Sequence, residues 1–252
     1  MASAPTNLAD LASRGMVSSA ALGTAARERT VPLLPVFGSL LPQAAVQRGS
    51  VVSCCGSAAV SLACAAVAGA SAAGSWSGVV GFGTTGHLTL GLATAAELGV
   101  ALERVVAVGE SVDTPFTDGQ WGDVVGSLID GFDMVVLGPS AQRVRAGTAR
   151  RLVARAQARG AVLVTVEAPV FGADLLLEAR YTRWQGLGAG HGVATGRVVE
   201  VALSGRRMPQ TRQAHWWLPA PDGQVRVVEV EHQPQAEPGV PVAPVVPLRR
   251  TG

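Results

Sequence analysis

The sequence contains no lysine, and all 20 of its basic residues are arginine. Catalysis through a lysine Schiff base or a lysine general base is therefore excluded. A phosphate loop that holds its nucleotide with the usual lysine is excluded for the same reason. Because the arginines are nearly balanced by 18 acidic residues, the net charge is only +2, which does not by itself indicate a nucleic-acid-binding protein.

Aromatic residues are also scarce, at 4% of the chain, although 48% of the residues are hydrophobic. The core must therefore consist mainly of alanine, valine and leucine. A chain of 252 residues is long enough for one large domain or two small ones.

Cysteine is limited to Cys54, Cys55 and Cys64. This odd number, without the spacing of a zinc site, argues against both a disulfide framework and a metal centre. We expect small buried apolar side chains in a reducing compartment, and no metal or cofactor. The four histidines likewise have no paired metal-ligand spacing; they are His87, His191, His215 and His232.

Charged side chains are absent between Arg48 and Glu97, so this stretch must be considered as a membrane span. Alanine, glycine and serine dominate residues 58–74 and contribute little to membrane insertion. A buried strand–helix–strand unit fits better. Asp10 and Arg14 interrupt any N-terminal signal peptide, and we expect a cytoplasmic protein.

Strands and helices alternate over the first two thirds of the chain, which predicts an α/β fold with a mainly parallel sheet flanked by helices. The predicted strands are Val51–Cys55, one starting at Gly78–Val80, Arg104–Val108, Phe132–Leu137 and Ala161–Val166. The predicted helices are Ala58–Ala70, His87–Leu98, Trp121–Leu128 and Ala146–Arg159. After Gly172 the pattern changes to strands joined by turns, which indicates an antiparallel edge; these strands are Asp174–Trp184, Arg197–Leu203, His215–Leu218 and Val225–Val230.

Three regions are expected from this pattern. Residues 1–37 form a short helix and a proline-broken linker that docks on the body, and residues 38–231 form the core domain. Residues 232–252 are rich in proline and valine without periodicity, which predicts a disordered tail.

The order of these elements resembles the RecA core, a P-loop NTPase fold. Three segments carry the resemblance: Gln47–Gly56 resembles the strand entering the phosphate loop, Ala95–Val106 the passage from helix to third strand, and Phe132–Leu137 the Walker B strand. The alanine- and arginine-rich texture, the run Gly186–Gly192 and the proline-rich tail resemble more closely a RecA-like accessory protein of actinobacterial mutagenesis cassettes, the ImuA-prime type. That resemblance implies a role in error-prone translesion synthesis after DNA damage, beside a polymerase-like adaptor and an error-prone polymerase.

The nucleotide-handling positions depart from the RecA pattern. A working P-loop needs a glycine-rich turn, a lysine for the phosphates and Ser or Thr for magnesium, but here Gly56-Ser57 runs directly into a helix. The Walker B strand ends in Gly138-Pro139, and the second strand carries Gly81-Phe82-Gly83 where a Glu would activate water. We therefore expect a vestigial phosphate loop at Gly56 and Ser57, with no catalytic residue and no enzyme activity.

An alternative is open at residues 81–86, which read Gly-Phe-Gly-Thr-Thr-Gly and match the dinucleotide-binding fingerprint. This motif follows a predicted strand and precedes a predicted helix, as the fingerprint requires. The competing hypothesis is therefore a nucleotide- or dinucleotide-binding α/β enzyme that uses Gly81–Gly86.

Two sets of side chains are candidates for binding macromolecules. Trp216, Trp217, Arg206 and Arg207 are of the types that dominate interface energies; we expect one of the two adjacent tryptophans to be core and the other a contact for the adaptor. Arginines that could meet DNA phosphates lie on or near one helix, and they are Arg143, Arg145, Arg151, Arg155 and Arg159. A solvated helix face is the competing interpretation of these arginines.

Overall fold

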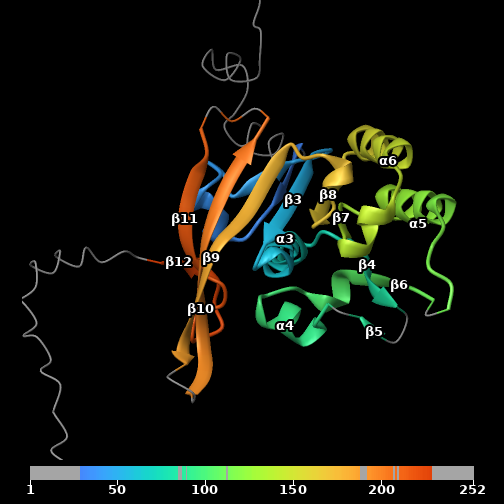
Figure 1. The fold of residues 1–252 in the computed structure, drawn as a ribbon. Coiled ribbons are helices and arrows are strands. Elements are labelled where there is room, and N and C mark those ends of the chain that lie inside the picture. Colours follow the sequence, from blue (N-terminus) through green and yellow to red (C-terminus); the bar gives the residue numbers. More distant parts are fainter. Residues whose placement is uncertain are drawn as a thin grey trace, which may run out of the picture.

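The computed structural model describes residues 29–84, 87–88, 90–111, 113–187, 192–206, 208 and 210–228. Their main feature is a ten-stranded sheet with helices on both faces (Figure 1). The α/β class, the mainly parallel central sheet and the antiparallel edge are confirmed. The predicted N-terminal helix and residues 232–252 lie outside the described residues.

The parallel part of the sheet contains six strands in the spatial order β6-β4-β7-β8-β3-β9. Their bounds are β3 (Val51–Gly56), β4 (Ser77–Thr84), β6 (Val105–Glu110), β7 (Met134–Leu137), β8 (Val162–Val166) and β9 (Leu175–Leu187). β7 and β8 are buried along their whole length, as central strands covered on both faces should be.

The antiparallel part extends the sheet beyond β9. It consists of β10 (Gly192–Gly205), β11 (Arg212–Trp217) and β12 (Arg226–Val227), each antiparallel to the strand before it. At the other side of the sheet, β5 (His87–Leu88) folds back on β4 as a short hairpin. The single long helix expected over 87–98 is therefore wrong: because Gly91 is extended, the helix α4 begins only at Leu92 and ends at Glu97.

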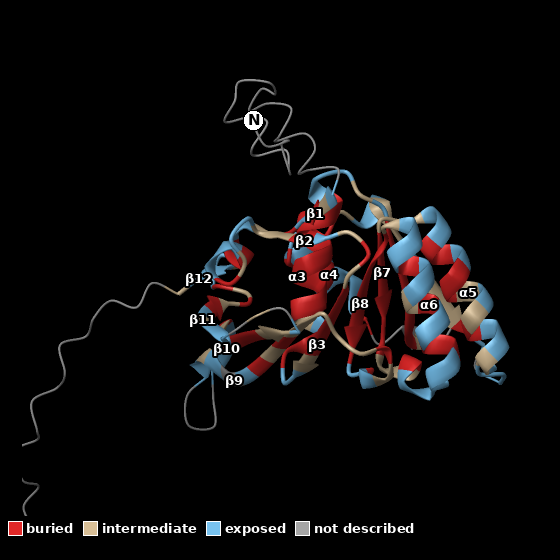
Figure 2. Cartoon of the chain, turned by 90° about the horizontal axis from the view of Figure 1, so that it is seen from above, coloured by how far each residue is buried: buried red, intermediate tan, exposed pale blue. Residues whose placement is uncertain are grey.

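Two helices cover each face of the sheet (Figure 2). α3 (Ala59–Ala72) and α4 pack on one face, and α5 (Asp118–Gly131) and α6 (Ala146–Arg159) pack on the other. The bounds of α6 are as predicted, because Gly160 at φ +73° ends the helix in the left-handed conformation. Thr117 and Gln120 form a capping box that starts α5.

The absence of charged side chains between Arg48 and Glu97 is explained by the burial of this segment in the fold. β3 and β4 are central strands, and α3 is buried almost all round. A Cβ atom on Gly69 would lie 2.1 Å from the carbonyl carbon of Leu33, so α3 needs glycine there to reach the N-terminal segment. None of the helices in the described ranges is both long and apolar enough to cross a membrane.

The N-terminal segment forms part of the core. β1 (Thr30–Pro32) and β2 (Ala45–Gln47) form an antiparallel ribbon, and the 3-10 turn Pro35–Ser39 lies between them. Val31 and Phe37 are completely buried against the α3 face. The prolines thus shape a short ribbon with a tight turn where we expected a docked linker.

Short 3-10 turns make three further connections, and each lies at an end of a strand. They are Leu102–Arg104 before β6, Pro139–Arg143 after β7 and Pro169–Phe171 between β8 and β9.

Candidate functional site

The position at which the resemblance to RecA implies a phosphate loop lies at the end of β3. Gly56 has φ +88°, and a Cβ atom there would lie 2.3 Å from the carbonyl oxygen of Ala179 on β9. Its backbone N–H donates a 2.8 Å hydrogen bond to the carboxylate Oε1 of Glu167, which directly follows β8. In a phosphate loop, a backbone N–H at this point faces an anion. Here the chain's own carboxylate accepts that hydrogen bond.

The link between β3 and α3 is too short for a phosphate cradle. Only Ser57 and Ala58 separate the two elements, and Ala58 provides no side-chain cap. On β10, Arg197 reaches the first turn of α3, where its guanidinium group donates a 2.6 Å hydrogen bond to the Ser61 hydroxyl. Burial lowers the pKa of Arg197, and the ring of Trp184 lies 5.2 Å from its guanidinium carbon.

The other two positions to which the resemblance to RecA assigns nucleotide chemistry lie at the ends of β7 and β4, where the two backbones pack closely. β7 ends at Leu137, and a Cβ atom on Gly138 would lie 2.4 Å from the carbonyl oxygen of Gly81. Glycine is therefore required at position 138 for the close approach of β4 and β7. Gly138 and Pro139 follow Leu137, and residues 81–83 are Gly-Phe-Gly, so neither strand end carries an acidic residue at these positions.

The pairing of one acidic residue at this edge was not predicted from the sequence. Glu110 ends β6 and is only 4% exposed. Both of its carboxylate oxygens accept hydrogen bonds from Arg143, at 2.5 and 2.6 Å. An acidic residue closing a run of valines is a signal that could have identified it. Because Arg143 neutralises it, the pair is suited to holding the 3-10 turn against β6.

The glycine motif at residues 81–86 does not have the context of a dinucleotide site. β4 continues through Thr84 and pairs back with β5, so Gly83 lies opposite Leu88. The fingerprint needs a tight turn from a strand directly into a helix. Thr85 and Gly86 lie outside the described residues, but α4 begins only at Leu92. The expected strand–turn–helix is wrong, because a hairpin intervenes.

Most of the candidate DNA-contacting arginines form ion pairs or hydrogen bonds with other residues of the chain. Arg155 and Arg159 of α6 both pair with Asp130 of α5, and these interactions, led by the hydrogen bond from Arg155, lower the pKa of Asp130. Arg143 pairs with Glu110. Arg151 donates a 2.9 Å hydrogen bond to the Thr148 hydroxyl. Arg145 is exposed on the same surface, so the set presents less free positive charge than its residue count suggests.

The two adjacent tryptophans lie on opposite faces of β11. Trp216 is completely buried, packs edge-on against Phe37 at 4.9 Å, and donates a 2.9 Å hydrogen bond from Nε1 to the Ser39 hydroxyl. Trp217 is partly exposed on the other face. Trp216 is thus the core residue, and Trp217 is the candidate contact. Arg206 is exposed after β10, whereas Arg207 lies outside the described residues.

The cysteines are poor nucleophiles. Burial raises the pKa of the Cys64 thiol to about 11 and also raises that of Cys54. The pKa of Cys55 is raised by burial and by the carboxylates of Glu167 and Glu178. Because the thiolate is the reactive form, these three thiols are suited to packing.

Comparison with known proteins identifies the family of this fold. Residues 39–171 match the family model described as the MT3502 N-terminal domain. The chain belongs to this family. An uncharacterized protein of Mycobacterium tuberculosis, Rv3395c, is 34% identical over 155 residues, which cover 60% of this chain and 71% of that protein. The family match contains β3 and the Gly56–Glu167 contact and ends before β9, so the antiparallel edge lies outside it.

Proposed function

We propose that this chain is a non-catalytic, RecA-like accessory protein that supports error-prone translesion synthesis after DNA damage. In this proposal it is an ImuA-prime-type protein that binds a polymerase-like adaptor and, through it, an error-prone polymerase. The chain uses no cofactor. Its retained α/β body is a scaffold for protein contacts.

The strand order supports the RecA-like part of the proposal. In chain order β3, β4, β6, β7, β8 and β9 are the first to sixth strands of the large sheet, apart from the short β5 hairpin, and their spatial order is 3-2-4-5-1-6. β10 and β11 follow as the next two; β10 runs against the parallel strands and β11 runs with them. This is the arrangement expected of a RecA-like core, with the phosphate-loop strand in the middle of the sheet.

The observation that carries the non-catalytic part is the hydrogen bond from the Gly56 N–H to the Glu167 carboxylate. A nucleotide phosphate brought to this N–H would meet a carboxylate of like charge. Like charges at close range repel one another, and the chain offers no lysine to offset that repulsion. The two-residue link to α3 adds no further cradle.

The partner-binding part is supported by the antiparallel edge. β12 pairs with Trp216 and Trp217 of β11, and the N–H of Val228 donates to the carbonyl oxygen of His215. No described strand pairs with the outer side of β11 from Arg212 to Ala214. A free strand edge suits strand addition by a partner. Trp217 and Arg206 add side chains of the types enriched at interface hot spots.

A genetic experiment tests the proposal. Deleting the gene should lower the damage-induced mutation frequency of the host, and the wild-type gene should restore it. The Ser57→Ala variant should restore it equally, because the vestigial loop does no chemistry. Trp217→Ala should restore it poorly. An unchanged mutation frequency in the deletion strain would contradict the proposed role.

A further inference from the structure

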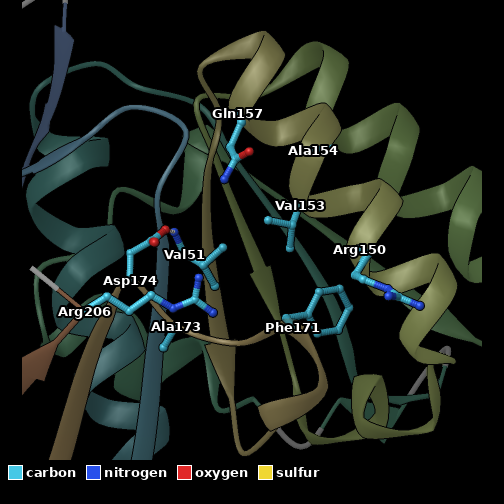
Figure 3. Close-up of a pocket in the computed structure, with 9 residues that line it drawn as sticks. All are labelled: Val51, Arg150, Val153, Ala154, Gln157, Phe171, Ala173, Asp174 and Arg206. Atoms are coloured by element: carbon cyan, nitrogen blue, oxygen red, sulfur yellow. Dashed lines mark hydrogen bonds between the residues drawn. The ribbon is translucent and has the colours of Figure 1, made fainter.

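A groove of about 220 Å³ lies between α6 and the segment that links β8 to β9 (Figure 3). Val51, Val153 and Phe171 form an apolar floor, of which Val51 and Phe171 are almost fully buried. Arg206 lies on one side of this groove and Arg150 of α6 lies on the other. The volume is below the roughly 300–1,000 Å³ of typical small-molecule sites, and it suits a single side chain.

The position of Arg206 is fixed by the backbone around it. Its N–H donates a 3.2 Å hydrogen bond to the carbonyl oxygen of Asp174, and a Cβ atom on Gly205 would lie 2.3 Å from that same oxygen. Gly172 has φ +69°, and its Cβ position is 3.3 Å from a guanidinium nitrogen of Arg206. These two glycines let the guanidinium group lie over the linking segment and point into the groove (Figure 3).

Neither arginine of the groove has an acidic partner within the described ranges. Arg150 donates only to the carbonyl oxygen of Ala146 in its own helix, at 3.3 Å. Asp174, the acid that lines the groove, accepts a 2.9 Å hydrogen bond from the N–H of Val51. Arg155, on the same helix as Arg150, is by contrast paired with Asp130. The groove therefore combines an apolar floor with two arginines that have no ion-pair partner among the described residues and with one carboxylate, that of Asp174, so its lining carries a net positive charge.

We propose that this groove binds a short acidic peptide segment of a protein partner. One large apolar side chain of the segment occupies the floor over Phe171, and neighbouring carboxylates pair with Arg206 and Arg150. Charge complementarity selects the acids, and the apolar floor selects the side chain between them. This inference rests on the proposed partner-binding function and adds the chemistry of the contact.

Nucleic acid fits this groove less well. Phosphate backbones are held by several cations spaced along the strand, but only two arginines, Arg150 and Arg206, line this groove, and Arg155 and Arg159 of α6 are paired with Asp130 of α5. An apolar floor gives a phosphate no hydrogen-bond donor. A peptide with both acidic and apolar side chains uses every part of the surface.

Selection from a phage-displayed random heptapeptide library on the immobilised full chain tests the proposal. The enriched sequences should carry Asp or Glu within three residues of Leu, Ile or Phe. A synthetic peptide of the enriched sequence should bind Arg206→Glu and Arg150→Glu at least tenfold more weakly than wild type. It should bind the matched control Arg145→Glu, an exposed arginine outside the groove, with wild-type affinity. Melting temperatures verify that each variant is folded.

Three results would overturn the proposal: enrichment without acidic residues, no enrichment above background, or equal affinity of the selected peptide for wild type and for both groove variants. Binding of a labelled oligothymidylate that is lost in Arg206→Glu would assign the groove to nucleic acid instead. The peptide selection contains no translesion protein. If it fails, the groove proposal fails, and the proposed adaptor interaction is tested by the pull-down alone. Loss of mutagenesis in the gene deletion likewise does not depend on this groove.

Discussion

The backbone N–H of Gly56 and the carboxylate of Glu167 are joined by a 2.8 Å hydrogen bond, although the residues are 111 positions apart in the sequence. β3 and β8 are parallel neighbours, with Cys54 opposite Val166, so the residue after β8 arrives beside the end of β3. Glu167 adopts φ +51° there, a conformation that few residues other than glycine adopt. The chain thus places its own negative charge where a RecA-like fold would bind phosphate.

The first prediction concerns nucleotide binding. Titration of the full chain with ATP and magnesium in a calorimeter should give no binding heat at micromolar ATP. The segment after β3 has no lysine and is too short to surround a phosphate, and the N–H of Gly56 already donates to Glu167. Ser57→Ala is the matched control, and it should behave as wild type does. Micromolar, magnesium-dependent affinity that this substitution abolishes would overturn the retired-site interpretation.

The second prediction concerns Trp216. Trp216→Ala should lower the free energy of unfolding by about 3–5 kcal/mol, because it leaves a cavity beside Phe37 and removes the donor to Ser39. Chemical denaturation measures this loss. Trp217→Ala, on the partly exposed face of β11, should cost much less stability. Equal losses for the two variants would contradict the assignment of Trp216 to the core.

The third prediction concerns the pH dependence of the α5–α6 contact. The folded-state pKa of Asp130 lies below its ordinary value of 3.8, chiefly because Arg155 donates a hydrogen bond to its carboxylate. Its contribution to stability is therefore complete above pH 3.8 and is lost as the pH falls through the lower folded pKa. The melting temperature of Asp130→Asn should be below that of wild type at pH 7, and the difference should shrink as the pH falls below 3.8. A difference independent of pH would show that charge pairing is not the cause.

Sequence reasoning predicted the parallel core well because its signals are local. The strand at β8 and the helix at α6 follow from apolar runs and from Gly160, and the bounds found for α6 are the predicted ones. The N-terminal ribbon escaped prediction because Val31 pairs with Val46 across a proline-containing connection. The β4–β5 hairpin escaped because the glycine motif at residues 81–86 also matches a turn from a strand into a helix.

The candidate site was partly visible for the same reason. The missing lysine and the short loop after Gly56 are local features. The Glu167 contact, the Glu110–Arg143 pair and the groove at Arg206 join residues distant in sequence, and only the sheet topology brings them together.

The fourth prediction concerns residues 232–252, for which the sequence predicts a tail that does not contribute to folding. A chain ending at Glu231 should keep its melting temperature, because proline-rich segments recover little free energy on ordering. A fall of more than about 5 °C, which corresponds to at least about 1 kcal/mol for a domain of this size, would show that the tail packs on the body.

Pull-down of the polymerase-like adaptor by the full chain tests the central claim most directly. Wild type and Ser57→Ala should retain the adaptor equally. Trp217→Ala, if its melting temperature stays close to that of wild type, should weaken binding by about 2 kcal/mol or more, roughly thirtyfold. Failure of the wild-type chain to retain the adaptor, or equal retention by folded Trp217→Ala, would contradict the account of this protein as a partner-binding scaffold that acts through its antiparallel edge.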